Sequence, residues 1–134
     1  MAPLFAATLV ALTLAPGAAT ADPALTAEAF DALSQGKTMT WSEFGTVYGV
    51  EQYLPDRRVR WTILGDICMT GHWYPQGDAI CFQYEDRDTP ACWFIGQQGS
   101  TLTALDTEDA LDTPPVIIEE TTEPLPCFGP EVGA

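Results

Sequence analysis

The sequence predicts a mainly β fold, an antiparallel meander sheet or partly closed barrel of six to seven strands with one short N-terminal helix, held by disulfides. Three observations favour this class. From residue 38 onward, apolar and polar residues alternate with the period of two that is typical of strands. Turn residues interrupt the alternation at short intervals, and connections this short join neighbouring antiparallel strands. Four cysteines in 134 residues are available for cross-links.

The first 21 residues have the layout of a secretory signal peptide. They are apolar and small, and they end in Ala19-Thr20-Ala21, an A-x-A cleavage site, although the start of the segment lacks Lys and Arg. Its apolar core is shorter than the roughly 20 residues that a membrane span requires, and no later stretch reaches that length. We therefore expect a signal peptide over residues 1–21 and a single exported domain over residues 22–134, periplasmic or secreted.

The charge of the chain excludes two classes of partner. The chain has nineteen acidic and five basic residues, which give a formal net charge of −14 at pH 7. This charge repels nucleic acids and anionic lipid. Solubility is the plain interpretation, and attraction of a cationic partner or metal ion is the alternative. The acidic clusters lack the spacing of a calcium loop, and the cysteines lack a C-x-x-C pair, so no metal or other cofactor is expected.

The elements follow in order along the chain. Residues 25–36 predict a short helix, with Thr26 as N-cap and Gly36 after the last turn. Phe30 and Leu33 share one face, so this helix should lie on an apolar surface. The predicted strands cover residues 38–44, 47–53, 58–64, 67–74, 79–85, 91–96 and 101–105. After residue 105 the composition becomes acidic and rich in proline, which predicts a tail over 106–134, interrupted only by an apolar run at 116–118 and tethered by Cys127.

Four cysteines in an exported chain predict two disulfides, with three connectivities open. A hairpin of residues 79–85 and 91–96 around Asp86-Arg87 places Cys81 opposite Cys92, with Cα atoms about 4.5 Å apart, within disulfide range. This leaves Cys68 with Cys127, a bridge that would pin the tail to the sheet. A longer loop that included Pro90 would break this register.

Part of the chain, roughly residues 38–95, resembles a family of small exported proteobacterial proteins that is itself uncharacterised. The shared order is a G-x-W, an I-C-F-x-Y and a C-W motif, found here as Gly71-His72-Trp73, Ile80-Cys81-Phe82-Gln83-Tyr84 and Cys92-Trp93. The resemblance implies export and an antiparallel sheet, and it implies no activity.

The aromatic residues are the main candidates for a binding surface. Trp73-Tyr74 and Trp93-Phe94 are adjacent pairs, so in each strand one ring must lie off the main core face. Filling of a core that one helix covers incompletely is the plain interpretation, and a ligand-binding face is the functional one. The candidate site residues are therefore Trp73, Tyr74 and Trp93, and burial of all three in the core would count against a binding role.

Arg58 and Arg60 are a further candidate pair, because they share the polar face of one strand. Pairing with Glu51 or with the acidic tail is the plain explanation, and an anionic ligand is the alternative. His72 is the single histidine and has no partnering nucleophile, so a surface position is expected.

These residues favour a non-catalytic binding or interaction module that uses an aromatic sheet face, with an envelope protein or a small ligand as partner. The alternative is a small hydrolase that depends on carboxylates such as Glu51 and Glu85. We prefer the first hypothesis because the sequence has no recognisable nucleophile, metal cluster or phosphate loop. A deep pocket with two facing carboxylates would favour the hydrolase.

Overall fold

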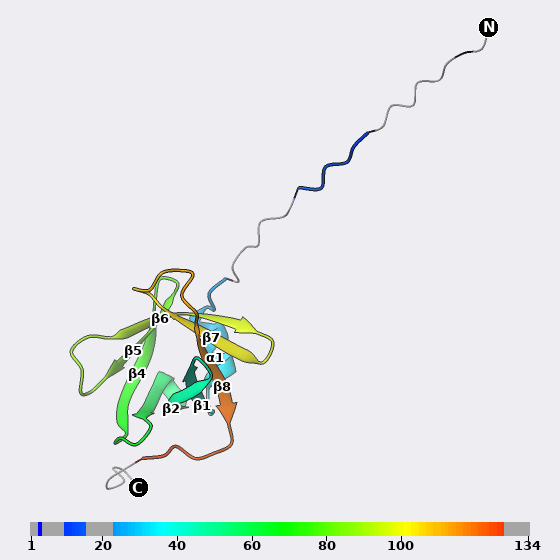
Figure 1. Ribbon diagram of the computed structural model, residues 1–134. Coiled ribbons are helices and arrows are strands. Elements are labelled where there is room, and N and C mark those ends of the chain that lie inside the picture. Colours follow the sequence, from blue (N-terminus) through cyan, green and yellow to red (C-terminus); the bar gives the residue numbers. More distant parts are fainter. Residues whose placement is uncertain (1–2, 4–9, 16–22, 128–134) are drawn as a thin grey trace.

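In the computed structural model, the described residues form a closed barrel of eight antiparallel strands and one α-helix. Figure 1 shows how these elements are arranged. The structure describes residues 3, 10–15 and 23–127. The predicted fold class is confirmed, and the predicted number of strands is too low by one. The elements are α1 (Ala27–Ser34), β1 (Thr38–Glu43), β2 (Thr46–Tyr53), the 3-10 turn η1 (Pro55–Arg57), β3 (Arg58–Ile63), β4 (Met69–Gln76), β5 (Ala79–Tyr84), β6 (Ala91–Gln98), β7 (Thr101–Asp106) and β8 (Val116–Thr121).

Most of the predicted signal peptide, with its cleavage site at Ala21, lies outside the described residues. Residues 10–15, within that segment, are exposed and have no regular secondary structure. Among the helices in the described part of the chain, none has the length and apolar character needed to cross a membrane.

The barrel closes through β8, which pairs with both β1 and β7. Every other strand pairs with its sequence neighbour, as a meander requires. β8 lies inside the segment that was predicted to be an acidic tail. Its inward residues Val116 and Ile118 are buried, while Glu119 and Glu120 point to solvent. The sequence analysis did not predict this strand. It is only six residues long, the segments on both sides are rich in acids and prolines, and its partner β1 lies far away in the chain.

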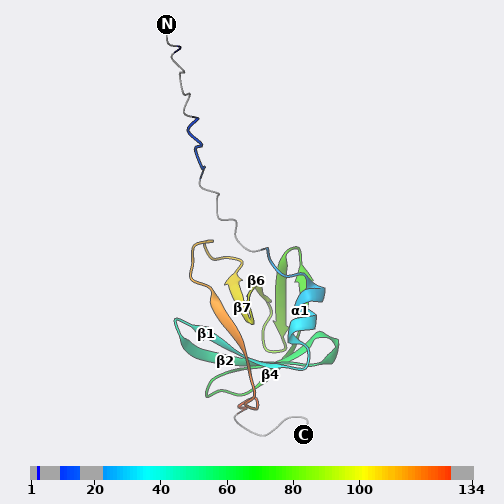
Figure 2. The same cartoon turned by 90° about the vertical axis from the view of Figure 1, so that its right-hand side faces the viewer.

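The helix α1 covers the end of the barrel at which β1 begins and β2 ends, as Figure 2 shows. The Thr26 hydroxyl accepts a hydrogen bond from the Ala29 N–H at 3.2 Å, which confirms the predicted N-cap. Phe30 is fully buried, and its ring meets those of Tyr53, Trp73 and Phe82 edge-on. Because one ring of α1 enters the barrel interior, we name this end the closed end.

Two inward-facing glycines make room for large rings inside the barrel. A side chain at Gly49 would overlap the ring of Trp61, which lies on the neighbouring strand β3. A side chain at Gly71 would overlap the backbone of β5 at Gln83 and approach the ring of Tyr84. The aromatic interior therefore depends on positions without a Cβ.

Both predicted disulfides are present, Cys81–Cys92 and Cys68–Cys127. Cys81 pairs with Cys92 across β5 and β6, in the predicted register. The loop between these strands does include Pro90, yet the register holds because the pairing begins one residue later, at Ala91.

The Cys68–Cys127 bridge holds the end of the described chain against the outside of the barrel. Leu125 lies there in a groove with Val50 and Leu64. Val50 points outward between inward neighbours on β2, yet it is only 5% exposed. The tether thus covers apolar surface on the outer face, which stabilises the closed sheet.

Candidate functional site

The end of the barrel opposite α1 is open and hollow, and we name it the open end. A cavity of about 250 Å³ lies there. This is smaller than the roughly 300–1,000 Å³ of pockets that hold drug-sized molecules. The cavity is lined by Trp41, Glu43, Tyr48, Trp61, Ile63, Tyr84, Arg87, Ala91 and Trp93.

The aromatic rings of the open end stand at steep angles to one another. Trp41 lies 5.8 Å from Trp61 at an interplanar angle of 79°, and 5.3 Å from Trp93 at 65°. Tyr48 lies 6.0 Å from Trp61 at 68°. These edge-to-face contacts hold the rings in place, so the walls of the cavity are largely preformed. Trp93 remains partly exposed, unlike Trp41 and Trp61.

A carboxyl group is enclosed in the barrel beside this aromatic cluster. Glu51 is fully buried, and the Tyr84 hydroxyl donates a hydrogen bond to its Oε2 at 2.7 Å. Burial raises the pKa of Glu51 to about 8, and the hydrogen bond from Tyr84 opposes this shift only in part. The side chain is therefore mostly protonated at neutral pH.

Three buried polar atoms in this region have no hydrogen-bond partner among the described residues. They are Oε1 of Glu51, Nε1 of Trp41 and the hydroxyl oxygen of Tyr53. Such groups are rare in folded proteins, because each costs about 1–3 kcal/mol of desolvation free energy. The three groups nevertheless interact with one another, because the Tyr53 hydroxyl lies close enough to both Glu51 and Trp41 for them to influence its pKa.

The electrostatics of the open end are dominated by carboxylates. Burial, together with the charges of Glu43 and Glu51, raises the pKa of Tyr48 to about 12. A second cavity of about 250 Å³ lies alongside and shares Glu43 and Trp93 with the first. Asp106 and Asp109 line this second cavity. Against these acids, the first cavity carries one basic side chain, Arg87.

The hairpin tip between β1 and β2 places a large ring at the same end. Phe44 lines the second cavity and is 88% exposed. Its φ is +49°, and Gly45 follows with φ +79°. Two successive positive φ values are typical of a hairpin turn that prefers Asn-Gly, so a phenylalanine at the first position carries backbone strain. An exposed, strained aromatic residue at the rim is costly for folding and points to a role outside it.

The structure does not bring the three predicted aromatic residues together on one face. Trp73 is 2% exposed and belongs to the closed end, where the Arg57 guanidinium lies 4.7 Å from its ring centroid. Tyr74 is partly buried on the outside of β4, beside the ring of His72. Trp93 alone lines the open end. Because two of the three rings keep solvent contact, the condition that would count against binding is not met.

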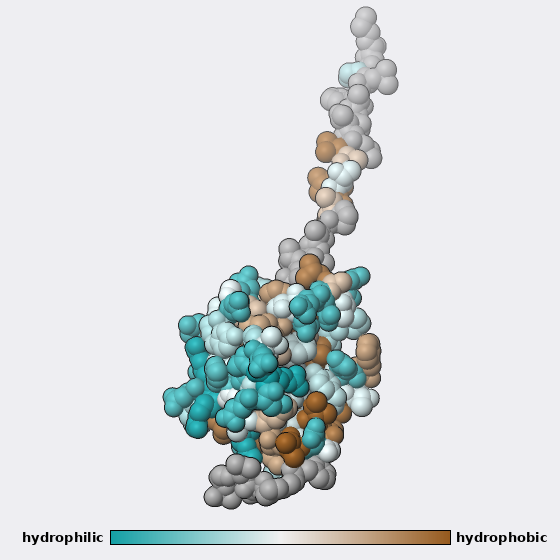
Figure 3. Space-filling model, turned by 90° about the vertical axis from the view of Figure 1, so that its left-hand side faces the viewer, coloured by the Kyte–Doolittle hydropathy of each residue, from teal (hydrophilic) through white to brown (hydrophobic). Residues whose placement is uncertain are grey.

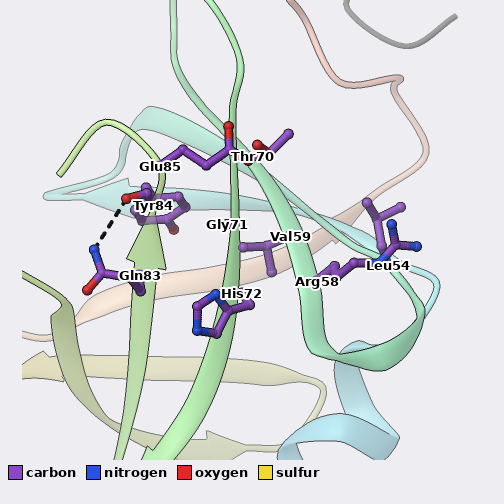
Figure 4. Close-up of a pocket in the computed structure, with 9 residues that line it drawn as sticks. All are labelled: Leu54, Arg58, Val59, Thr70, Gly71, His72, Gln83, Tyr84 and Glu85. Carbon is purple, nitrogen blue, oxygen red and sulfur yellow. Dashed lines mark hydrogen bonds between the residues drawn. The ribbon is translucent and has the colours of Figure 1, made fainter. Parts of the chain in front are cut away.

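The predicted arginines lie on the outer surface. Arg58 lines a shallow groove of about 380 Å³ together with His72, Gln83 and Glu85, which Figure 4 shows. Arg60 donates a hydrogen bond from Nη2 to Sγ of Cys127 at 3.6 Å. The expected pairing of these arginines with Glu51 is wrong, because Glu51 points into the barrel and the arginines alternate to the other face.

The two carboxylates of the hydrolase hypothesis lie in different environments. Glu51 is enclosed, whereas Glu85 is exposed and lines the outer groove. Tyr84 lies between them in the sequence and turns its hydroxyl inward to Glu51. General acid–base catalysis on one substrate needs both groups to reach the same bond, and this arrangement does not offer such a site.

Within residues 3, 10–15 and 23–127, no three His, Cys, Asp or Glu side chains are grouped to hold a metal ion. The face in Figure 3 is largely hydrophilic, with hydrophobic side chains gathered near its lower edge. Large apolar side chains exposed on loops and strand ends of the barrel include Phe44, Ile63, Leu64 and Ile67.

Comparison with known protein families, with curated proteins and with solved structures found no match. The resemblance to small exported proteobacterial proteins therefore stays a prediction. The functional interpretation rests on the geometry of the open end alone.

Sequence reasoning missed most of the open-end cluster. It did not single out Trp41, Tyr48 or Trp61, and it considered Glu51 only as a partner of the arginines or as a catalytic acid. A signal was present in the alternation of β2, where Glu51 falls on the same face as Gly49 and Tyr53. A carboxylate on the apolar face of a strand is the feature that could have identified the site.

Proposed function

We propose that this protein is an exported, non-catalytic binding module that receives a small ligand at the open end of its barrel. The observation that carries the proposal is the preformed aromatic cavity, closed by a helix at one end only. Small eight-stranded barrels have interiors just wide enough for side chains or one small ligand. Here α1 fills one end with Phe30, and within residues 23–127 no helix covers the other end.

The unpartnered polar atoms support the same proposal. A ligand or its bound water can offer hydrogen bonds to groups that the protein leaves unsatisfied, and those groups then favour the bound state. Of these groups, Nε1 of Trp41 belongs to a residue that lines the cavity, whereas Glu51 and Tyr53 do not line it. A carboxylate-dependent hydrolase has no comparable support, since Glu51 and Glu85 do not share a cavity.

Export is part of the proposal. The leader predicted over residues 1–21 and the two disulfides both favour a periplasmic or secreted location, where thiols oxidise. Cell fractionation of the native host, followed by mass measurement of the isolated protein, tests it. A processed chain with four fewer hydrogens than its reduced form is expected, and a protein found with four free thiols inside the cell would contradict export.

The binding proposal can be tested by a ligand-observed NMR screen of small fragments against the exported protein. Two matched variants assign the site: Trp93→Ala removes a ring of the cavity, and Phe94→Ala removes the adjacent ring, which points to the other side of β6. Both side chains are partly buried. Fragments should lose affinity for Trp93→Ala and keep it for Phe94→Ala. Equal effects of the two substitutions, or no bound fragment, would contradict the proposal.

A further inference from the structure

The chemistry of the open end narrows the class of ligand, if the proposed binding function holds. Its walls are aromatic rings set at 65–79° to their neighbours. These rings are in contact with one another, and the surface that a ligand can reach belongs mainly to the two partly exposed rings, Tyr48 and Trp93. A ring face carries the negative part of the quadrupole and attracts cations, most strongly when the ring belongs to tryptophan. Trp41, Trp61 and Trp93 all line this cavity.

The acidic residues at the rim of the open end also favour a cationic ligand. Glu43 lines both cavities of the open end, and Asp106 and Asp109 line the second one. The whole chain has a formal net charge of −14, so the long-range field also favours a positive ligand over a negative one. Arg87 is the one basic group of the first cavity; it is exposed on the loop between β5 and β6.

We infer that the ligand of the open end is a small organic cation, a quaternary or tertiary ammonium group with a short substituent, held among the tryptophan and tyrosine rings with Glu43 at the rim. The cavity volume of about 250 Å³ limits the size of the substituent. An anion would meet the opposed charges of Glu43 and Arg87 at the entrance and the aromatic rings inside, whose faces repel it. A hydrated metal ion fits the aromatic lining poorly, because it prefers oxygen ligands.

The test compares choline with 3,3-dimethylbutan-1-ol, a neutral molecule of nearly the same shape, by titration calorimetry and by the NMR signals of the tryptophan indole N–H groups. Cation–π attraction of about 1–2 kcal/mol predicts that choline binds roughly tenfold more tightly than the neutral isostere. Equal affinities of the two molecules would overturn the inference and leave the binding function standing. Absence of any fragment that is sensitive to Trp93→Ala would overturn both.

A pair of charge variants separates the site from the overall charge. Glu43→Gln and Glu85→Gln each remove one exposed carboxylate, the first at the rim of the cavity and the second in the outer groove. Choline affinity should fall severalfold in Glu43→Gln and stay within twofold in Glu85→Gln, while binding of the neutral isostere stays the same in both. An equal loss in the two variants would show that net charge alone attracts the cation, and the inference would fail.

Discussion

At the closed end of the barrel, Phe30 is fully buried with its ring 5.0 Å from that of Trp73, whereas at the open end Trp93 remains partly exposed beside a cavity of about 250 Å³. Both ends are built from aromatic rings in edge-to-face contact. They differ in what covers them: a helix places a ring into the closed end, and loops surround the open end. Aromatic content by itself therefore does not distinguish a packed core from a binding cavity; the covering element does.

A second difference concerns polar groups. Glu51, with its raised pKa, lies in the barrel interior and accepts a hydrogen bond from Tyr84, which lines the open-end cavity. Stability is therefore expected to depend on packing at the closed end and on protonation in the interior next to the open end. Four substitutions test this comparison, in order of decreasing effect.

The largest effect is expected from emptying the closed end. Phe30→Ala should lower the free energy of unfolding by about 3–5 kcal/mol, because it removes a fully buried ring and leaves a cavity. Urea denaturation followed by tryptophan fluorescence measures this change. Leu33→Ala, on the same helix but only partly buried, is the control and should cost less. Similar losses in both variants would show that Phe30 does not fill the closed end.

The next effect is a pH dependence that comes from Glu51. Its pKa is about 8 in the folded state and has the ordinary value of 4.5 when exposed. Between these values the unfolded chain ionises while the folded protein stays protonated, so the free energy of unfolding falls with rising pH, by about 1.4 kcal/mol per pH unit at most. The contribution is fully present below pH 4.5 and is lost by about pH 8. Burial raises the pKa values of Tyr48, Tyr53 and Tyr84, so these groups stay neutral throughout this range.

Glu51→Gln keeps an acceptor for the Tyr84 hydroxyl and cannot ionise. It should match the wild type near pH 4.5 and become the more stable protein toward pH 8. Urea denaturation at several pH values measures the two slopes. Parallel curves for variant and wild type would contradict a protonated Glu51 in the folded state.

A smaller effect is expected from filling the space that Trp61 needs. Gly49→Ala places a methyl group where the Trp61 ring lies, and overpacking of this kind costs about 1–3 kcal/mol. It should also displace the ring and weaken ligand binding at the open end. Gly96→Ala is the matched control, because its methyl group would approach one atom, the Thr103 hydroxyl oxygen, at 2.9 Å, whereas the methyl group at Gly49 would overlap several atoms of the Trp61 ring. Thermal denaturation compares the two, and an equal cost would contradict the close approach of Gly49 and Trp61.

The smallest effect has the opposite sign. Phe44→Asn gives the hairpin tip the residue that its positive φ favours, and it should raise the free energy of unfolding by about 1 kcal/mol. The same change removes an exposed ring from the open end, so ligand affinity should fall while stability rises. A variant that lost stability would contradict strain at Phe44.

The sequence analysis predicted the meander, the helix cap and both disulfide bridges from local patterns. The period of two in residues 58–63 identifies β3, and the hairpin register identifies the Cys81–Cys92 pair. Closure could not be predicted in the same way. β8 has partners in β1, far away in the chain, and a strand of six residues in acidic surroundings has no local feature that identifies a partner.

The residues of the candidate site show the same difference between local features, which could be predicted, and long-range features, which could not. Trp93 was predicted from the adjacent pair Trp93-Phe94, since alternation forces the two rings to opposite faces. Trp73 and Tyr74 satisfied the same rule, yet they belong to the closed end and to the outer surface. The alternation of side chains along a strand assigns each residue to one of the two faces of the sheet. It does not predict at which end of the barrel the residue lies or which element covers it.

By itself, the amino-acid sequence determined the strands of the meander other than β8, the helix with its N-cap, and the Cys81–Cys92 register, because each of these follows from neighbours along the chain. The tertiary structure alone decided that the sheet closes, that α1 plugs one end and that Glu51 becomes a protonated acid beside an aromatic cavity. The physical reason is that burial, and the pKa shift that burial causes, depend on distant segments, and no local pattern contains their positions.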